Sequence, residues 1–357
     1  MGLFILDDTN LRALELTVNN HEEVAAVGIG SAGIKIVSLL SRRTVLVDRF
    51  AYVSCDDGDF STVEREDTIA IESPVDQKLT PAIVRGLALR QHGRIMEALR
   101  GSKVVFVVAG LGGATGSGLA PVVASIAKEC GATAVGVAVM PFEFEKKTKF
   151  YAGVSLRRLR AAARGVVVID NETLLRSSSE DTTLADIYDT ANKAPVKALS
   201  SLLSRATEGA RPLGLNKLLG TVLRDGYCLL GLSSSGSEDK AEDALAGAVV
   251  SLGKLGDTKE AAHAVVSMNG DSTLTAPEVG LVVDRAGSAT GNSGLDVEYG
   301  VDYSGTAQLQ VALLASGFGS TKYDDYDPLA KVLGDRVLDD EMDYALPEGL
   351  EFLQCCD

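Results

Sequence analysis

The chain has few of the residues that build metal centres, catalytic triads and disulfide frameworks. Among its 357 residues are only 3 histidines and 5 cysteines. The histidines are isolated, and the cysteines have neither the spacing of metal ligands nor that of a disulfide framework. We therefore expect no metal site and no histidine-based triad, and the cysteine pattern suits a reducing compartment.

Basic residues are in the minority, and long apolar runs are missing. The sequence carries 34 Lys and Arg against 49 Asp and Glu, which gives a formal net charge of −15. This balance argues against nucleic acid and against direct docking on anionic lipid, because both need basic patches. No segment has the apolar length that spans a bilayer, and the first residues lack a secretion signal. We expect a cytoplasmic protein that does not insert into membranes.

The most informative segment present is a glycine-rich loop at Gly110–Gly118. Five of its nine residues are glycine, it follows the apolar run at 103–109, and a helix-like run at 119–128 comes next. Glycines let the backbone approach a ligand, and the following helix adds the positive end of its dipole. The loop ends without the Gly-Lys-Ser/Thr of a P-loop, so binding would depend on backbone amides and on the hydroxyls of Thr115 and Ser117. The pattern predicts a phosphate-binding loop.

A second glycine turn, Gly28-x-Gly30-x-x-Gly33, lies between a predicted strand at 24–29 and a predicted helix at 34–40. Its spacing matches the dinucleotide-binding fingerprint, with Asp48 as the candidate ribose-binding acid. A dinucleotide-dependent oxidoreductase is therefore one alternative. Against it, no catalytic pair for hydride transfer follows, and the loop at Gly110–Gly118 has no place in that fold.

Short apolar runs alternate with helix-length segments, which is typical of an α/β fold with a parallel sheet. Further strands are expected at 45–53, 131–139 and 165–169. A long central helix from Leu184 would link the first domain to a smaller α/β unit. In that unit, 295–301 and 308–315 are expected to form an antiparallel pair.

Several motifs together resemble the tubulin/FtsZ superfamily. Gly110–Gly118 is similar to the tubulin-type loop G-x-G-G-G-T-G-[ST]-G, with Ala114 replacing one glycine. Further runs that fit the family lie at 120–124, 140–145, 169–175, 226–227, 267–270, 298–302 and 315–318. The resemblance covers about residues 23–318. It implies a tubulin-type GTP-binding domain at 23–183, a central helix at 184–211 and a C-terminal domain at 212–318, flanked by an extension at 1–22 and an acidic, mobile tail at 319–357.

The resemblance also implies where GTP or GDP would bind, with Mg²⁺ as an optional companion. The turn at Gly28–Gly33 would hold the inner phosphates, and the loop at Gly110–Gly118 would hold the outer phosphates. Glu145 would bind the ribose. Asn171 and Asn192 would bind the edges of the guanine, and Tyr188 would stack on its face. Lys35 stands where the family has asparagine, and Lys149 where it has arginine. The expected nucleotide contacts are Gly28, Gly30, Ser31, Ala32, Gly33, Lys35, Gly110, Gly112, Gly113, Ala114, Thr115, Gly116, Ser117, Gly118, Glu145, Lys149, Asn171, Tyr188 and Asn192.

Two departures from the family pattern concern catalysis. The region near the γ-phosphate, 79–90, contains one glycine where the family has a glycine-rich loop. The family also places two acids in a loop that meets the next subunit's nucleotide; here Gly214 and Lys217 occupy those positions, and no carboxylate lies between Glu208 and Asp225. Losing such acids costs on the order of 10²–10⁴ in rate. Lys217 would either pair with the neighbour's γ-phosphate or be a solvated loop lysine.

These observations predict a cytoskeletal subunit for cell division or cell shape, located at the division site. It would bind GTP and join filaments, with itself or with a hydrolysis-competent paralogue, but hydrolyse GTP poorly alone. An adaptor could bind its tail. Two alternatives stay open: a non-polymerising regulator, and a GTPase whose catalytic loop is rewired around Asp225 or Glu208.

Overall fold

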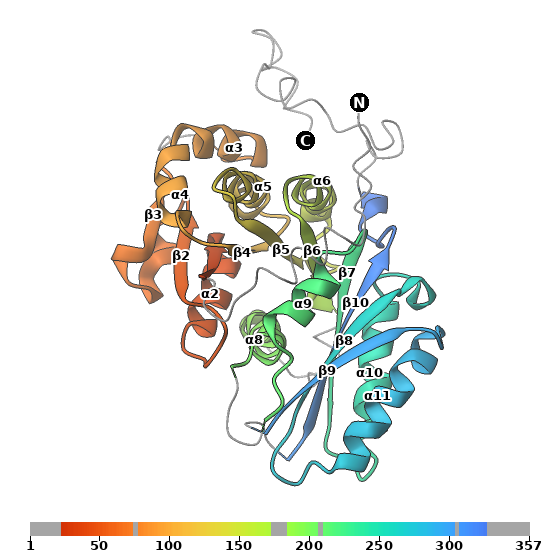
Figure 1. Cartoon of the computed structure of the whole chain (residues 1–357). Helices are drawn as coiled ribbons and strands as arrows, with labels where there is room; N and C mark the ends of the chain where they lie inside the picture. The colour runs from red at the N-terminus through yellow and green to blue at the C-terminus, as the bar shows by residue number, and fades with distance from the viewer. Residues whose placement is uncertain (1–22, 74–77, 173–183, 206–209, 304–306, 327–357) are drawn as a thin grey trace.

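The computed structural model describes residues 23–73, 78–172, 184–205, 210–303 and 307–326. They form one ten-stranded sheet with the order β3-β2-β1-β4-β5-β6-β7-β10-β8-β9, flanked by helices (Figure 1). The predicted α/β fold class is confirmed. Within the described residues, no helix is both long enough and apolar enough to cross a membrane.

The first six strands are all parallel. Strands β1, β4, β5 and β6 are buried along almost their whole length, as expected for strands that helices cover on both faces. The elements of this half are β1 Val24–Ile29, α2 Gly30–Leu40, β2 Arg49–Ser54, η1 Asp57–Thr62, η2 Arg65–Asp67, β3 Thr68–Ala70, α3 Pro81–Arg90, α4 His92–Leu99, β4 Val104–Gly110, α5 Ala114–Glu129, β5 Thr133–Met140, α6 Lys146–Ala162 and β6 Gly165–Asp170.

The second half continues the same sheet, because β7 pairs in parallel with β6. Its elements are α8 Leu184–Leu202, α9 Leu215–Val222, β7 Tyr227–Ser235, α10 Lys240–Gly253, η3 Thr258–Glu260, β8 His263–Asn269, α11 Ala276–Thr290, β9 Asp296–Asp302, β10 Leu309–Phe318 and η4 Asp324–Tyr326. The predicted antiparallel pair of 295–301 with 308–315 is wrong. Strand β8 lies between them, pairing in parallel with β9 and antiparallel with β10, because α11 returns the chain to the starting end of β8.

Two hydrophobic cores lie on opposite faces of the sheet, because successive strand residues point to opposite sides. On β1, for example, Val27 belongs to one core and Ala26 to the other. Helices α3 to α6, α10 and α11 contribute to the first core, and α2, α8 and α9 to the second.

Two predicted boundaries differ from the structure. The central helix, expected to run to residue 211, ends at Leu202, and Arg211 instead pairs with Val301 of β9. The tail was expected from 319, but residues 319–326 pack on the fold, with Tyr323 only 1% exposed. The rest of that tail and the extension at 1–22 lie outside the described residues.

Candidate nucleotide-binding site

The two glycine segments meet where the strand order reverses. From β1 the chain moves outward to β2 and β3, and β4 then lies on the other side of β1. Gly28–Gly33 follows β1 and Gly110–Gly118 follows β4, so both loops lie at the carboxyl edge of adjacent strands. In open α/β sheets, this switch point is where ligands bind.

Helices α2 and α5 both begin at this edge without a side-chain cap and without an acidic residue in the first turn. The N–H groups of a first helical turn have no intrahelical partner, and the helix dipole makes them attractive to anions. The two turns are neighbours, since a Cβ on Gly30 would lie 3.4 Å from Thr115 Cβ. Gly113 and Ser31 are exposed at the surface of this corner. Two uncapped helix ends side by side fit a phosphate chain.

Inside the loop, backbone groups are packed too closely for other residues. Gly112 has a φ of 111°, and its N–H donates to the buried Ser117 Oγ over 2.8 Å. A Cβ on Gly116 would lie 2.1 Å from the carbonyl oxygen of Gly110. Ser117 was expected to offer its hydroxyl to phosphate, but that hydroxyl lies inside the protein and shapes the loop. Thr115 stays partly exposed.

The other predicted phosphate-side residues divide into surface and packing positions. Lys35 is exposed and Ala32 half-buried on α2, whereas Gly28, Gly33 and Gly118 are buried. The region at 79–90, expected to be an altered γ-phosphate loop, contains α3. The first residue of α3, Pro81, packs closely against Gly118: a Cβ on Gly118 would lie 2.7 Å from the Pro81 carbonyl oxygen.

The segment after β5 carries the predicted ribose acid and its neighbouring cation. Glu145 accepts a hydrogen bond from the Phe142 N–H over 2.9 Å, so its carboxylate closes the turn into α6. Lys149 Nζ lies 3.4 Å from the Tyr326 hydroxyl and 4.9 Å from the centre of its ring. Both side chains therefore lie at the carboxyl edge beside the loops, and Lys149 also meets the C-terminal segment.

The end of β6 offers an unsatisfied acceptor. Asn171 Oδ1 is buried and has no hydrogen-bond partner among the described residues. A buried amide oxygen without a donor is costly, and a guanine ring presents N–H donors that would satisfy it. Asn192 lies on α8, half-buried. Tyr188 is on the same helix, but its side chain is outside the described part of the chain.

Asp48, the candidate ribose acid of the dinucleotide alternative, lies at the opposite edge of the sheet. It accepts from the N–H of Val24, the first residue of β1, over 3.1 Å and pairs with Arg205 at 2.7 Å. An acid at the amino end of β1 cannot reach a ligand at its carboxyl end. The structure therefore gives the oxidoreductase interpretation no support.

Sequence reasoning missed Cys55, which follows β2 at the carboxyl edge. Its thiol is half-buried and lies near Thr115 of the loop at Gly110–Gly118; burial raises the pKa of this thiol, and the neighbouring Thr115 opposes the rise. Its place directly after a strand of the same sheet was the signal that could have found it.

Lys217, on α9, is not a lone solvated lysine. Its ammonium pairs with the carboxylate of Glu298 on β9. A Cβ on Gly165 would lie 2.2 Å from the Val222 carbonyl oxygen, so α9 ends at the amino end of β6, away from the glycine loops. Lys217 therefore approaches an acid that is distant in sequence, which the local pattern could not reveal.

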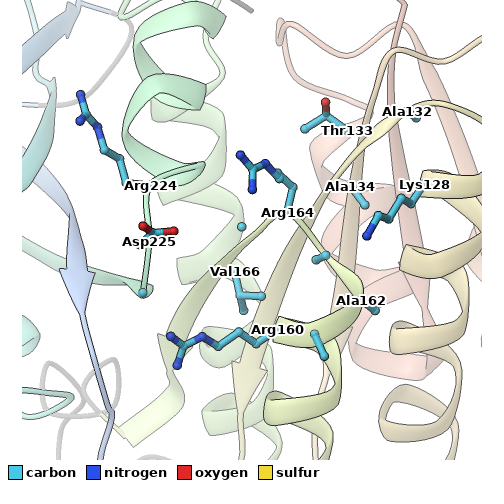
Figure 2. Close-up of a pocket in the computed structure, with 14 residues that line it drawn as sticks. Lys128, Ala132, Thr133, Ala134, Arg160, Ala162, Arg164, Val166, Arg224 and Asp225 are labelled. Atoms are coloured by element: carbon cyan, nitrogen blue, oxygen red, sulfur yellow. The ribbon is translucent and has the colours of Figure 1, made fainter. Parts of the chain in front are cut away.

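A hollow of about 530 Å³, whose lining residues are drawn in Figure 2, lies at the amino ends of β5 and β6. It is therefore at the opposite edge of the sheet from the glycine loops. Lys128, Arg160, Arg164 and Arg224 line it together with Asp225. These cations lie at or just after the C-terminal ends of α5, α6 and α9, where they stabilise the helix dipoles. The helix C-termini therefore account for the positive charge that lines this hollow. Among the described residues, no group of three or more His, Cys, Asp or Glu side chains could hold a metal ion.

Comparisons of the sequence and of the structure point to the same family. The model of the Tubulin/FtsZ family GTPase domain matches residues 79–179, which include the loop after β4. The cell division protein FtsZ of Buchnera aphidicola subsp. Schizaphis graminum is 29% identical over 337 residues, covering 92% of this chain and 86% of that protein. The family model, the FtsZ relative and the fold together support membership of the tubulin/FtsZ superfamily.

Solved structures of superfamily members agree with this. An empty FtsZ dimer from M. jannaschii is 25% identical, with a TM-score of 0.73, over 87% of this chain and 93% of that one. A protofilament of CetZ2 from Haloferax volcanii with GTPγS bound shares the fold, with 21% identity and a TM-score of 0.69 over 87% of this chain and 98% of that one. The low identities are consistent with divergence from these proteins.

Proposed function

We propose that the protein binds a guanine nucleotide at the carboxyl edge of β1, β4, β5 and β6, and that it assembles into filaments that serve cell division or cell shape. The observation that supports this most is the meeting of two uncapped helix N-termini at the switch point of the sheet. The unsatisfied Asn171 Oδ1 supports a base with N–H donors. Relatives described as cell division FtsZ and as a GTPγS-bound protofilament support the assembly.

Equilibrium binding of a fluorescent GTP analogue, with GTP and ATP as competitors, tests the first part. We expect GTP to displace the analogue at lower concentration than ATP. If GTP does not displace the analogue, or displaces it no better than ATP does, the proposal is refuted. Sedimentation with GTP and Mg²⁺, alone and with an FtsZ that retains both loop acids, tests assembly and separates a filament subunit from a non-polymerising regulator.

We further propose that the protein hydrolyses GTP slowly by itself. Between Ala210 and Arg224, α9 and its flanking loops offer no carboxylate, and the Lys217 cation is neutralised by Glu298. In a mixed filament, this surface would leave a partner's GTP intact and lower turnover per subunit. Unchanged turnover together with no co-sedimentation would contradict the idea.

One observation favours a second candidate, a GTPase with a rewired loop. Glu298 brings a carboxylate to Lys217, and it is 44% exposed at its side chain. Phosphate release across a wide protein concentration range distinguishes the two. Release that rises steeply with concentration and is lost in Glu298→Gln would support the rewired GTPase, whereas negligible release throughout would support slow hydrolysis.

A further inference from the structure

Residues 319–326 form a segment that contacts both halves of the fold, and we call it the C-terminal clasp. From the second half, the Leu255 carbonyl accepts from the Lys322 N–H over 2.9 Å, and the Tyr227 hydroxyl lies 3.4 Å from Asp324. From the first half, Arg160 donates to the Gly319 carbonyl over 3.3 Å. The clasp lies along α6 and ends at the carboxyl edge of the sheet.

The strongest contacts of the clasp go to Asp170, the last residue of β6. Asp170 is fully buried, and its carboxylate accepts from Lys322 Nζ at 2.6 Å and from the Tyr323 hydroxyl at 2.7 Å. A buried carboxylate is tolerated only when charge and hydrogen bonds compensate it. Burial, followed by the Asp170 charge, raises the pKa of Tyr323 well above its usual value, so the phenol keeps the proton that it donates.

Asp170 in turn fixes the local backbone. Its Oδ1 accepts from the N–H of Glu172 over 3.0 Å, which closes a side-chain-to-backbone turn around Asn171. This turn leaves Asn171 Oδ1 buried and without a partner among the described residues. At the far end of the clasp, Tyr326 contacts Lys149, another predicted nucleotide contact.

We propose that Lys322 and Tyr323 are positioning residues for base recognition: by fixing Asp170, they set the turn that presents Asn171 Oδ1 to the guanine N–H groups. This inference rests on the proposed guanine-nucleotide binding. It assigns a role in the nucleotide site to a segment that sequence patterns placed in a mobile tail. Adenine presents an acceptor where guanine presents its ring N–H, so loss of position would weaken discrimination between the two bases.

Tyr323→Phe in the full chain tests the proposal, because it removes only the hydroxyl that Asp170 accepts. The measured quantity is the ratio of the ATP and GTP dissociation constants, obtained by competition. Loss of a hydrogen bond to a charged group predicts a fall in this ratio of roughly tenfold. Lys322→Met, at a side chain that is 25% exposed, provides a second variant should Tyr323→Phe fold poorly.

Tyr227→Phe is the matched control. It also removes a buried tyrosine hydroxyl that contacts the clasp, but its partner is Asp324 and not Asp170. We expect Tyr227→Phe to keep the wild-type ratio and Asn171→Ala to lose it. A ratio unchanged in both Tyr323→Phe and Lys322→Met, or lowered equally in Tyr227→Phe, would overturn the positioning role. A wild-type protein without preference for GTP would instead refute the proposed guanine binding, and the clasp proposal with it.

Discussion

The carboxyl edge of the sheet and the α9 region contrast in how they are built. At the carboxyl edge, Gly110–Gly118 is one continuous segment, and its backbone supplies the helix N-terminus that would meet phosphate. At α9, the feature that matters is a pair of side chains, Lys217 and Glu298, 81 positions apart in the chain. A site built from one continuous backbone segment can be predicted from the sequence. A site built from two side chains that only the tertiary structure brings together cannot. The resemblance seen in the sequence implies that the glycine loop keeps the family pattern and that α9 lacks the two acids of that pattern.

The largest effect is expected from Gly116→Ala. The added Cβ would lie 2.1 Å from the Gly110 carbonyl oxygen, which forces the phosphate loop open. We expect nucleotide affinity to fall by about 100-fold or more, as several charge-assisted hydrogen bonds are lost together. Binding of a fluorescent GTP analogue measures this, with circular dichroism reporting whether the fold survives.

Gly113→Ala is the matched control in the same loop. A Cβ there meets nothing within 4 Å, and Gly113 has a φ of −79°, which any residue adopts. Because the added methyl group displaces no neighbouring atom but lies at an expected phosphate contact, we expect its affinity to fall much less than that of Gly116→Ala. An affinity in Gly116→Ala as high as in Gly113→Ala would mean that the close packing of this loop does not decide nucleotide binding.

The next largest effect concerns α9. Lys217→Asp combined with Glu298→Gln would place one acid on α9 without a like charge opposite it. If the missing acid limits hydrolysis, phosphate release should rise by about tenfold or more, part of the 10²–10⁴ that such groups contribute. Lys217→Ala combined with Glu298→Gln is the control, because it removes the pair without adding an acid. Similar rates in the two variants would show that the α9 acid is not what limits turnover.

A smaller effect is expected on stability from the Lys217–Glu298 pair itself. Both side chains are about 40% exposed, and solvent screens such pairs. A double-mutant cycle with Lys217→Met and Glu298→Gln, followed by urea unfolding, should give a coupling of about 0.2–1 kcal/mol that falls as salt rises. A much larger, salt-insensitive coupling would contradict the view of the pair as a solvated surface contact.

The smallest effect should come from His263, at the start of β8. Burial lowers the pKa of His263 below its ordinary value of 6.5, and the nearby Arg224, just after α9, lowers it further, while Asp296 opposes them. The unfolded chain therefore binds more protons, so stability should fall as pH drops through about 6.5. His263→Gln should flatten this part of the pH profile of the unfolding free energy. An unchanged slope would show that the imidazole is not responsible.

Several errors of sequence reasoning have one physical origin. Strand β9 was expected to pair with β10, yet it pairs with β8. Helix α11 is a crossover between β8 and β9, and the strand that β9 pairs with depends on which edge of the sheet is available. The helix expected to reach residue 211 ends at Leu202. Arg211 instead forms a β-bridge with Val301. The segment at 319–326 is acidic and rich in tyrosine, so its composition suggested a tail, but Tyr323 and Lys322 satisfy the buried Asp170.

The sequence by itself determined the parallel α/β core, the two glycine loops and the absence of acids around α9, because strand apolarity, glycine spacing and local composition are properties of neighbouring residues. Only the tertiary structure decided that Ser117 points inward, that Glu298 reaches Lys217 and that the C-terminal clasp closes on Asp170. Each of these depends on a contact that the fold brings together, between a side chain and the backbone for Ser117 and between two side chains for the other two. A buried polar group must find its partner wherever the chain supplies one, and sequence distance has no bearing on that requirement.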